Sequence, residues 1–209
     1  MSKKIIITIA RQFGSGGREI GETVAKLLGI PLFDKELITD AAAKGNLSEE
    51  VLKKTDESAA NSLLYTLAMG SNVVGATMHF GYKMPINDKL FILQSDVIKS
   101  YARSGSCVII GRCADYVLRD EPSIFRIFVY ADLEHRKARV AERHPEIKSS
   151  QIVDVINKTD KRRASYYNFY TGNKWGKYDN YDIAINSSRL GIQGAAQMIA
   201  ECVKQLMEK

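Results

Sequence analysis

Short apolar runs alternate with longer amphipathic segments along most of this chain. The runs are rich in β-branched residues and nearly unbroken, which is typical of strands buried on both faces of a parallel sheet. They cover residues 5–10, 30–33, 107–110, 124–130 and 181–186. Between the runs, apolar residues recur at helical spacing. In the first such segment these residues are Ile20, Val24, Leu27 and Leu28.

Strands that alternate with helices predict an α/β fold, a doubly wound parallel sheet of about five strands with helices on both faces. Gly29 is placed to end the first helix. Further helices are predicted at residues 35–44, 87–103, 132–144, 150–171 and 191–207. The part of the chain from 45 to 84 has only weak periodicity, and we predict a helical insertion at about residues 35–85.

The turn between the first strand and its helix is dense in glycine, with Gly14, Gly16 and Gly17 close together. A strand, a glycine turn and a helix in this order aim several backbone N–H groups and the positive end of a helix dipole at one point. Glycine suits such a turn because a side chain would block an approaching anion, and because turn residues can require a positive φ. The turn predicts a phosphate cradle. The alternative is a tight strand-to-helix connection and nothing more.

This turn departs from the Walker A pattern G-x-x-x-x-G-K-[ST]. If Gly17 is the last loop glycine, Arg18 takes the lysine position and Glu19 the Ser/Thr position. If Gly16 is the last, Gly17 falls at the lysine position. Neither register supplies the hydroxyl ligand for Mg²⁺. Arginine can still hold phosphate, through a planar bidentate fork.

Polar residues also follow the second and third strands. In an open parallel sheet, ligands bind beyond the carboxyl ends of the strands. Asp34 and Lys35 come directly after the second strand, and Arg112 follows the third, with Asp115 shortly after it. We therefore expect the guanidinium group of Arg112 to bind phosphate at this edge. The alternatives are that Asp34 only caps the next helix, and that Arg112 pairs with a carboxylate such as Asp115 for structural reasons.

The helix predicted at 150–171 mixes charged and aromatic residues in its second half. Asp160, Arg162 and Arg163 precede three tyrosines, at positions 166, 167 and 170. This pattern favours an arginine-bearing flap that closes over phosphates and excludes water. Two alternatives are a solvated helix with ordinary i, i+3 pairs and a surface for single-stranded nucleic acid.

The helix predicted at 132–144 carries Arg136, Arg139 and Arg143 at spacings of three and four. Residues at these spacings share one helix face. A charge run of this kind is by default a solvated surface.

Composition and charge narrow the class of protein. The chain has 209 residues, of which 45% are hydrophobic and 26% charged, as expected of one soluble globular domain with an insertion. A net charge of +6, spread along the chain, favours a small anionic ligand over a dedicated nucleic-acid surface. Three cysteines without metal or disulfide spacing predict reduced thiols in a cytoplasmic protein. No stretch suggests a membrane span or a signal peptide.

Four segments together resemble the cytidylate-kinase-like family of P-loop proteins. In chain order they read IARQFGSGGREIG, LFDKELI, VIIGRCADYVL and DKRRASYYNFYTG. The resemblance covers almost the whole chain and implies a P-loop NTPase-like fold. It implies a single P-loop kinase-like domain over residues 1–209, an acceptor-binding helical insertion at about 35–85 and a lid at about 149–178.

The resemblance also implies an activity. The chain would be an ATP-dependent phosphotransferase, a nucleoside monophosphate (CMP-like) kinase. ATP and Mg²⁺ would be its cofactors, and a nucleotide or other small phosphorylated acceptor its partner. The resemblance implies that the donor phosphates lie on Gly14, Ser15, Gly16, Gly17 and Arg18, and we include Glu19, the next residue, in this set. By the same resemblance, the acceptor faces Asp34, Arg112 and Asp115, and we include Lys35 because it follows Asp34 at the same edge.

The catalytic residues that the resemblance implies are Arg18 in the loop and, in the lid, Arg162 and Arg163, with Asp160 orienting the lid pair. The chain lacks the P-loop lysine and its following hydroxyl, and residues 45–84 contain no recognisable cytosine-reading set. No metal ligand is assigned beyond a Glu or Asp acting directly or through water. Two alternatives therefore stay open. One is a catalytically weak or inactive nucleotide-binding regulatory protein, and the other is a small-molecule kinase with a non-nucleotide acceptor.

Overall fold

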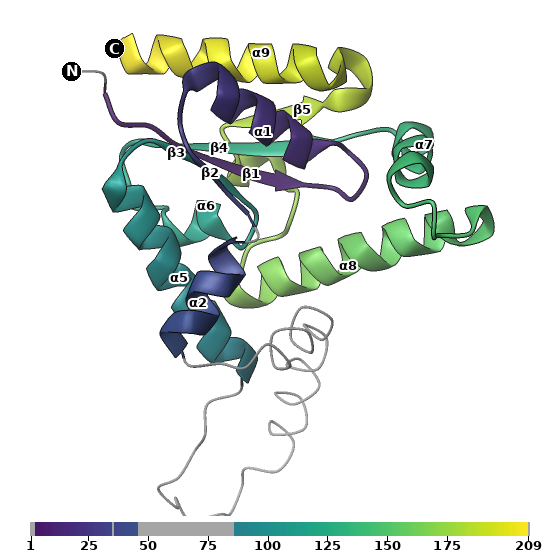
Figure 1. Ribbon diagram of the computed structural model, residues 1–209, viewed down its shortest axis with the longest axis horizontal. Helices are drawn as coiled ribbons and strands as arrows, with labels where there is room; N and C mark the ends of the chain where they lie inside the picture. Colours follow the sequence, from purple (N-terminus) through teal and green to yellow (C-terminus); the bar gives the residue numbers. More distant parts are fainter. Residues whose placement is uncertain (1–2, 35, 46–85, 209) are drawn as a thin grey trace, which may run out of the picture. The chain divides into compact units, whose positions relative to one another are not determined.

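A computed structural model describes residues 3–34, 36–45 and 86–208 of the chain (Figure 1). Five parallel strands form one sheet in the order β2-β3-β1-β4-β5. The strands are β1 (Ile6–Arg11), β2 (Leu32–Phe33), β3 (Cys107–Ile110), β4 (Ile124–Tyr130) and β5 (Ile183–Asn186). Each of the five apolar runs corresponds to one strand, which confirms the predicted α/β fold. Strands β2 and β5 are shorter than their runs, and β1 extends one residue beyond its run, to Arg11.

All the helices except the short α6 follow predicted segments. The helices are α1 (Gly17–Leu28), α2 (Glu36–Gly45), α5 (Ile86–Ser104), α6 (Ala114–Val117), α7 (Leu133–Arg143), α8 (Ile152–Thr171) and α9 (Ser187–Glu208). Gly29 ends α1 with a left-handed φ of 65°, as predicted. Most of the predicted insertion, residues 46–85, and the predicted acceptor residue Lys35 lie outside the described residues. Within the described ranges, the fold has no helix with the length and apolarity that a membrane crossing requires.

The chain divides into two compact units. One consists of Met1–Asp34 and Ile98–Lys209 and holds the whole sheet; the other is Lys35–Val97. The first unit contains every predicted site residue except Lys35. The predicted insertion falls within the second unit.

Both faces of the sheet in the first unit are covered. Ile5, Ile7 and Ile9 pack on one face with residues of α1 and α9, among them Val24 and Ile199. Figure 1 shows these two helices side by side over that face, with α6 and α8 on the other side of the sheet. A second cluster, which includes Phe128 and Tyr181, lies apart from the first. Burial of alternate residues on both faces explains why the strand sequences are almost continuously apolar.

Two features differ from the predicted pattern of burial. Leu27, expected on the inner face of the first helix, is 49% exposed, because the contacts of α1 with the sheet run through Ile20 and Val24 instead. The last helix begins at Ser187 and contains a kink at Gly191, where φ is 66°. The apolar repeat alone placed its start at this glycine.

The glycines of α1 and α9 provide a test of how tightly α1 packs on the sheet. A methyl group at Gly21 would approach Cδ1 of Ile110 to 2.6 Å and Cδ1 of Ile9 to 3.2 Å, whereas one at Gly194 would meet only Cβ of Leu190, at 3.7 Å. Replacing a helical glycine by alanine stabilises a helix by about 0.5–1 kcal/mol, and overpacking a core costs about 1–3 kcal/mol. We expect Gly21→Ala to lower, and Gly194→Ala to raise, the free energy of unfolding measured in urea. Equal effects of the two substitutions would contradict this packing.

Candidate functional site

The glycine turn after β1 leads directly into α1. Gly14 and Gly16 have φ values of 77° and 76°, so the predicted need for positive φ is confirmed at both positions. Helix α1 begins at Gly17, and its N-cap Gly16 offers no side chain to accept a hydrogen bond. The amides of the first helical turn have no partner within the helix. Amides in this position can donate to an anion.

The glycines themselves are packed against the protein's own chain. A Cβ atom at Gly14 would lie 2.9 Å from the carbonyl oxygen of Arg136, and one at Gly17 would lie 2.5 Å from Cβ of Arg11. At Gly16 the same atom would collide with Cδ1 of Ile192. Close packing of the loop therefore requires these glycines, as the tight-connection alternative expects.

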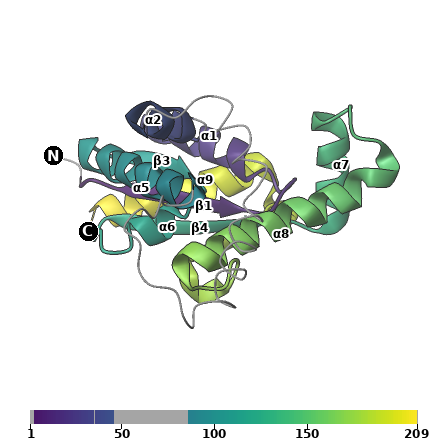
Figure 2. The ribbon, with the colours of Figure 1, turned by 90° about the horizontal axis from the view of Figure 1, so that it is seen from below.

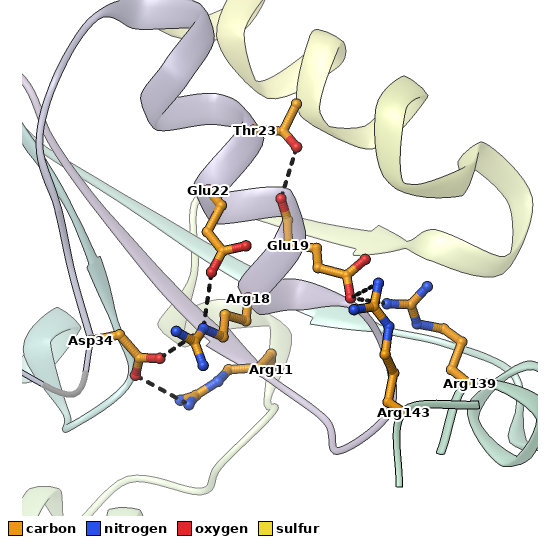
Figure 3. A network of polar contacts seen from close by, with 8 residues as sticks. All are labelled: Arg11, Arg18, Glu19, Glu22, Thr23, Asp34, Arg139 and Arg143. Atoms are coloured by element: carbon orange, nitrogen blue, oxygen red, sulfur yellow. Dashed lines mark hydrogen bonds and ion pairs between the residues drawn. The ribbon is translucent and has the colours of Figure 1, made fainter. Parts of the chain in front are cut away.

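Charged residues converge where three neighbouring strands end. Arg11 closes β1, Asp34 follows β2, and Arg112 comes shortly after β3; these strands are adjacent in the order β2-β3-β1. Figure 3 shows the carboxylate of Asp34 facing the guanidinium groups of Arg18 and Arg11. Its Oδ2 lies 3.2 Å from Nε of Arg18, and its Oδ1 lies 4.0 Å from Nη2 of Arg11. Arg18 also contacts Glu22, at 3.0 Å.

Helix α8 adds a further guanidinium group to this place. Nη1 of Arg163 donates to the carbonyl oxygen of Arg11 across 3.0 Å. Burial, together with the charges of Arg163, Arg112 and Arg18, lowers the pKa of Arg11 to about 9, although Asp34 raises it. The group remains a cation at pH 7. Burial also lowers the pKa of Arg163, against the opposing effect of Asp160. We call Arg11, Arg18, Arg112 and Arg163 the arginine cluster.

The backbone after β3 is bent to make room for this cluster. Gly111, Arg112 and Cys113 are consecutive left-handed residues, with φ of 70°, 56° and 55°. A Cβ atom on Gly111 would overlap Nη1 of Arg11, so a side chain at this position would displace that guanidinium group. Non-glycine residues with positive φ cost of the order of 1 kcal/mol and concentrate at functional sites.

The arginines of α7 contact the loop region as well. Arg139 and Arg143 both pair with Oε1 of Glu19 in the first turn of α1, at 2.9 and 2.8 Å (Figure 3). Arg136 is 6% exposed, and its Nη2 lies 2.7 Å from Oδ2 of Asp160. The default expectation of a solvated face is therefore wrong for Arg136. Figure 2 shows why, since α7 and α8 lie next to one another at one end of the sheet.

Asp160 joins the loop to both helices. One carboxylate oxygen accepts the backbone N–H of Phe13 at 2.7 Å, and the other accepts Arg136. Burial raises the pKa of Asp160, although these donors lower it. The predicted partners were Arg162 and Arg163. Arg163 joins the cluster, but Arg162 is exposed, and its Nη2 lies 3.4 Å from the hydroxyl of Thr159.

Asp115 lies in a buried pair with Tyr167. It is 7% exposed and accepts a 2.7 Å hydrogen bond from the hydroxyl of Tyr167 on α8. Burial raises the pKa of Asp115, and the hydrogen bond from Tyr167 lowers it. The carboxylate therefore fastens α8 to α6.

The described residues fit phosphate groups better than they fit a protein-bound Mg²⁺. Three acids lie beside the turn. Glu19 and Asp34 are each engaged by two guanidinium groups, and Asp160 accepts the N–H of Phe13 and the guanidinium group of Arg136. The hydroxyl of Ser15 donates to the carbonyl oxygen of Gln12 at 2.9 Å. In the described part of the chain, no three His, Cys, Asp or Glu side chains are grouped so that they could hold a metal ion. Mg²⁺ is usually bound through carboxylates and substrate phosphates.

Sequence reasoning missed Arg11, and it left the α7 arginines without a role. Arg11 is a charged residue at the end of a buried strand, which is a signal that points to the functional edge of a parallel sheet. For Arg139 and Arg143, the signal was their shared face on the helix that follows β4. Their partner, Glu19, is more than a hundred residues away in sequence.

Comparisons with known proteins agree with this architecture. No curated protein matches the chain in sequence. Among solved structures, it is similar to an uncharacterized protein from Eubacterium ventriosum ATCC 27560, with 28% identity and a TM-score of 0.71 over 96% of this chain and 99% of that one. It is also similar to a gluconokinase from Sinorhizobium meliloti 1021, with 13% identity and a TM-score of 0.55 over 100% of this chain and 96% of that one. A third similar structure is a shikimate kinase from Bacteroides thetaiotaomicron, with 13% identity and a TM-score of 0.53 over 97% of this chain and 99% of that one.

At 13% identity these last two likenesses show the fold alone, which is that of the P-loop kinases. The sequence profile of the cytidylate kinase-like family matches residues 6–189. This match runs from the first residue of β1 through the glycine turn, the arginine cluster and α8 into the start of α9. The chain therefore belongs to the cytidylate kinase-like family.

Proposed function

We propose that this protein is an ATP-dependent phosphotransferase. The observation that carries the proposal is the convergence of Arg11, Arg18, Arg112 and Arg163 around Asp34, beside the first turn of α1. Guanidinium groups so close together disfavour one another, and a polyanion between them relieves that repulsion. Membership of a kinase-like family supports a nucleoside triphosphate as that polyanion.

The chemistry of phosphoryl transfer suits such a site. Charge spreads over the oxygens of the transferred group, and the protein acts mainly by positioning and electrostatic stabilisation. ATP would supply the phosphoryl group, held by the amides from Gly14 to Glu19. Arg163 would stabilise the charge that develops, since its guanidinium group is already anchored on the carbonyl oxygen of Arg11. Asp160 would keep loop and lid helix in register through Phe13 and Arg136.

For the acceptor we propose a nucleoside monophosphate of the CMP class. Arg112 offers a planar fork to its phosphate, and Asp34 and Lys35 follow the adjacent strand. The family resemblance supports the same assignment for Asp115, which would act through its hydrogen bond to Tyr167. For Mg²⁺ we propose entry with the nucleotide, since the nearby acids are already paired.

Two specific observations favour other functions. The fold is shared with a gluconokinase and a shikimate kinase, which supports a small hydroxylated acceptor in place of a nucleotide. Arg18, which replaces the P-loop lysine in one register, pairs with Glu22 and Asp34. This pairing supports a protein that binds nucleotide without transferring phosphate.

A coupled assay of ATP consumption separates these functions. The panel contains the nucleoside monophosphates, shikimate and gluconate, and calorimetry with ATP runs in parallel. Turnover with CMP supports the proposal. Turnover only with a hydroxylated acid selects the small-molecule kinase, and binding without turnover selects the regulatory protein. If ATP neither binds nor is consumed, the proposal is wrong.

Neighbouring cations on α8 provide a sharp test of Arg163. We expect Arg163→Ala to lower kcat by roughly 10³-fold, the loss typical of an arginine that stabilises the transferred group. Lys161→Ala removes the same charge from an exposed position of the same helix, and we expect no more than about a twofold change. Arg162→Ala should lose less than Arg163→Ala, because its guanidinium group contacts Thr159. Equal rates for Arg163→Ala and Lys161→Ala would remove Arg163 from the site.

The space that Gly111 leaves for Arg11 can be tested by nucleotide binding. A methyl group at Gly111 would displace Nη1 of Arg11, whereas at Gly29, with a similar φ of 65°, it would meet nothing within 4 Å. Both substitutions carry a backbone cost of about 1 kcal/mol. We expect Gly111→Ala to weaken ATP binding roughly tenfold in calorimetry, and Gly29→Ala to leave it unchanged. Unchanged binding in both variants would show that Arg11 does not contact the nucleotide.

A further inference from the structure

Two arginines of α7 converge on a single carboxylate oxygen at the start of α1. Nη2 of Arg139 lies 2.9 Å and Nη2 of Arg143 lies 2.8 Å from Oε1 of Glu19. Figure 3 shows both guanidinium groups directed at this carboxylate from α7, on the opposite side of α1 from Arg18 and Asp34. Guanidinium groups commonly hold carboxylate and phosphate oxygens in this way.

The surroundings of Glu19 consist of anion-binding groups. The first-turn amides of α1 have no partner within the helix, and no side chain caps them at Gly16. Nη2 of Arg139 lies 3.1 Å from the point where a Cβ atom of Gly16 would stand, so this arginine borders the glycine turn. Its Nε is buried and, in the described part of the chain, has no hydrogen-bond acceptor. One carboxylate therefore occupies a place with more donors than it can satisfy.

The ion pairs of Glu19 are within reach of a ligand from solvent. The side chain of Glu19 is 28% exposed, that of Arg139 is 25% exposed and that of Arg143 is 57% exposed. Ion pairs with this much exposure are weak, because water screens them. A ligand with several phosphate groups can replace one carboxylate and satisfy donors that the carboxylate leaves unused.

We propose that Glu19 is an internal competitor for the donor phosphates and discriminates between ligands by the length of their phosphate chain. This inference rests on the proposed function, in which the first turn of α1 receives the donor. A single phosphate group can take the first-turn amides and leave the pairs of Glu19 intact. A triphosphate extends further and must displace Glu19 from Arg139 and Arg143. Glu19 therefore lowers the affinity for long chains and spares short ones.

Calorimetry with inorganic tripolyphosphate and inorganic phosphate, both in EDTA so that no metal takes part, tests this inference. We expect Glu19→Gln to bind tripolyphosphate about five- to tenfold more tightly than the wild type, and phosphate within about twofold. Glu142→Gln is the matched control, since it removes an exposed carboxylate next to Arg143 in the chain. It should bind both ligands as the wild type does.

A second substitution identifies the groups that Glu19 releases. Adding Arg143→Ala to Glu19→Gln should cancel the gain for tripolyphosphate. Thermal unfolding of each variant verifies that it is folded, and Glu19→Gln should unfold at a slightly lower temperature while binding more tightly. A carboxylate that merely fastens α7 would give lower stability with equal or weaker binding.

The outcomes separate this inference from the function on which it rests. If tripolyphosphate binds but Glu19→Gln gains nothing, or gains no more than Glu142→Gln, the role of Glu19 is wrong and the phosphate site stands. If neither the wild type nor Glu19→Gln binds tripolyphosphate, the phosphate site and the role of Glu19 are both wrong.

Discussion

The organisation of this protein depends on holding several guanidinium groups together at the carboxyl edge of a buried parallel sheet. The strand order β2-β3-β1 brings Asp34, Arg112 and Arg11 to one place, and α8 adds Arg163. Desolvation of these cations is costly, as the lowered pKa of Arg11 shows. The cost is tolerable because Asp34 pairs with two of them and because the sheet is rigidly packed on both faces.

Hydrogen bonds from several other elements hold the loop before α1 in place. The N–H of Phe13 donates to Asp160, and the hydroxyl of Ser187 donates to the carbonyl oxygen of Ser15. The side-chain oxygen of Gln12 accepts the N–H of Ala131, so the ends of β4 and β5 also fix the loop. A loop held in this way is preorganised, and preorganised donors are the most effective electrostatic catalysts, since they need no rearrangement when charge develops.

The departure from the Walker A pattern has a structural counterpart. Where that pattern has a lysine and a hydroxyl, this chain has Arg18 and Glu19 in one register, and both side chains form ion pairs. Arg18 pairs with Asp34 and Glu22, and Glu19 pairs with Arg139 and Arg143. The two residues thus direct ion pairs to opposite sides of α1 (Figure 3). In the function that we propose, the arginine cluster would supply the positive charge that a P-loop usually draws from lysine and metal.

The sequence by itself determined the five strands, the end of the first helix at Gly29 and the glycine turn with its positive φ, because local patterns of apolar residues and glycine encode these features. The family resemblance also came from the sequence and is confirmed. Only the tertiary structure decided which charges meet. Asp160 contacts Arg136 and the N–H of Phe13, whereas Arg162 was one of its predicted partners. Asp115 accepts a hydrogen bond from Tyr167. Such partners lie on different elements, and spacing along one element carries no information about contacts that arise when distant elements pack together.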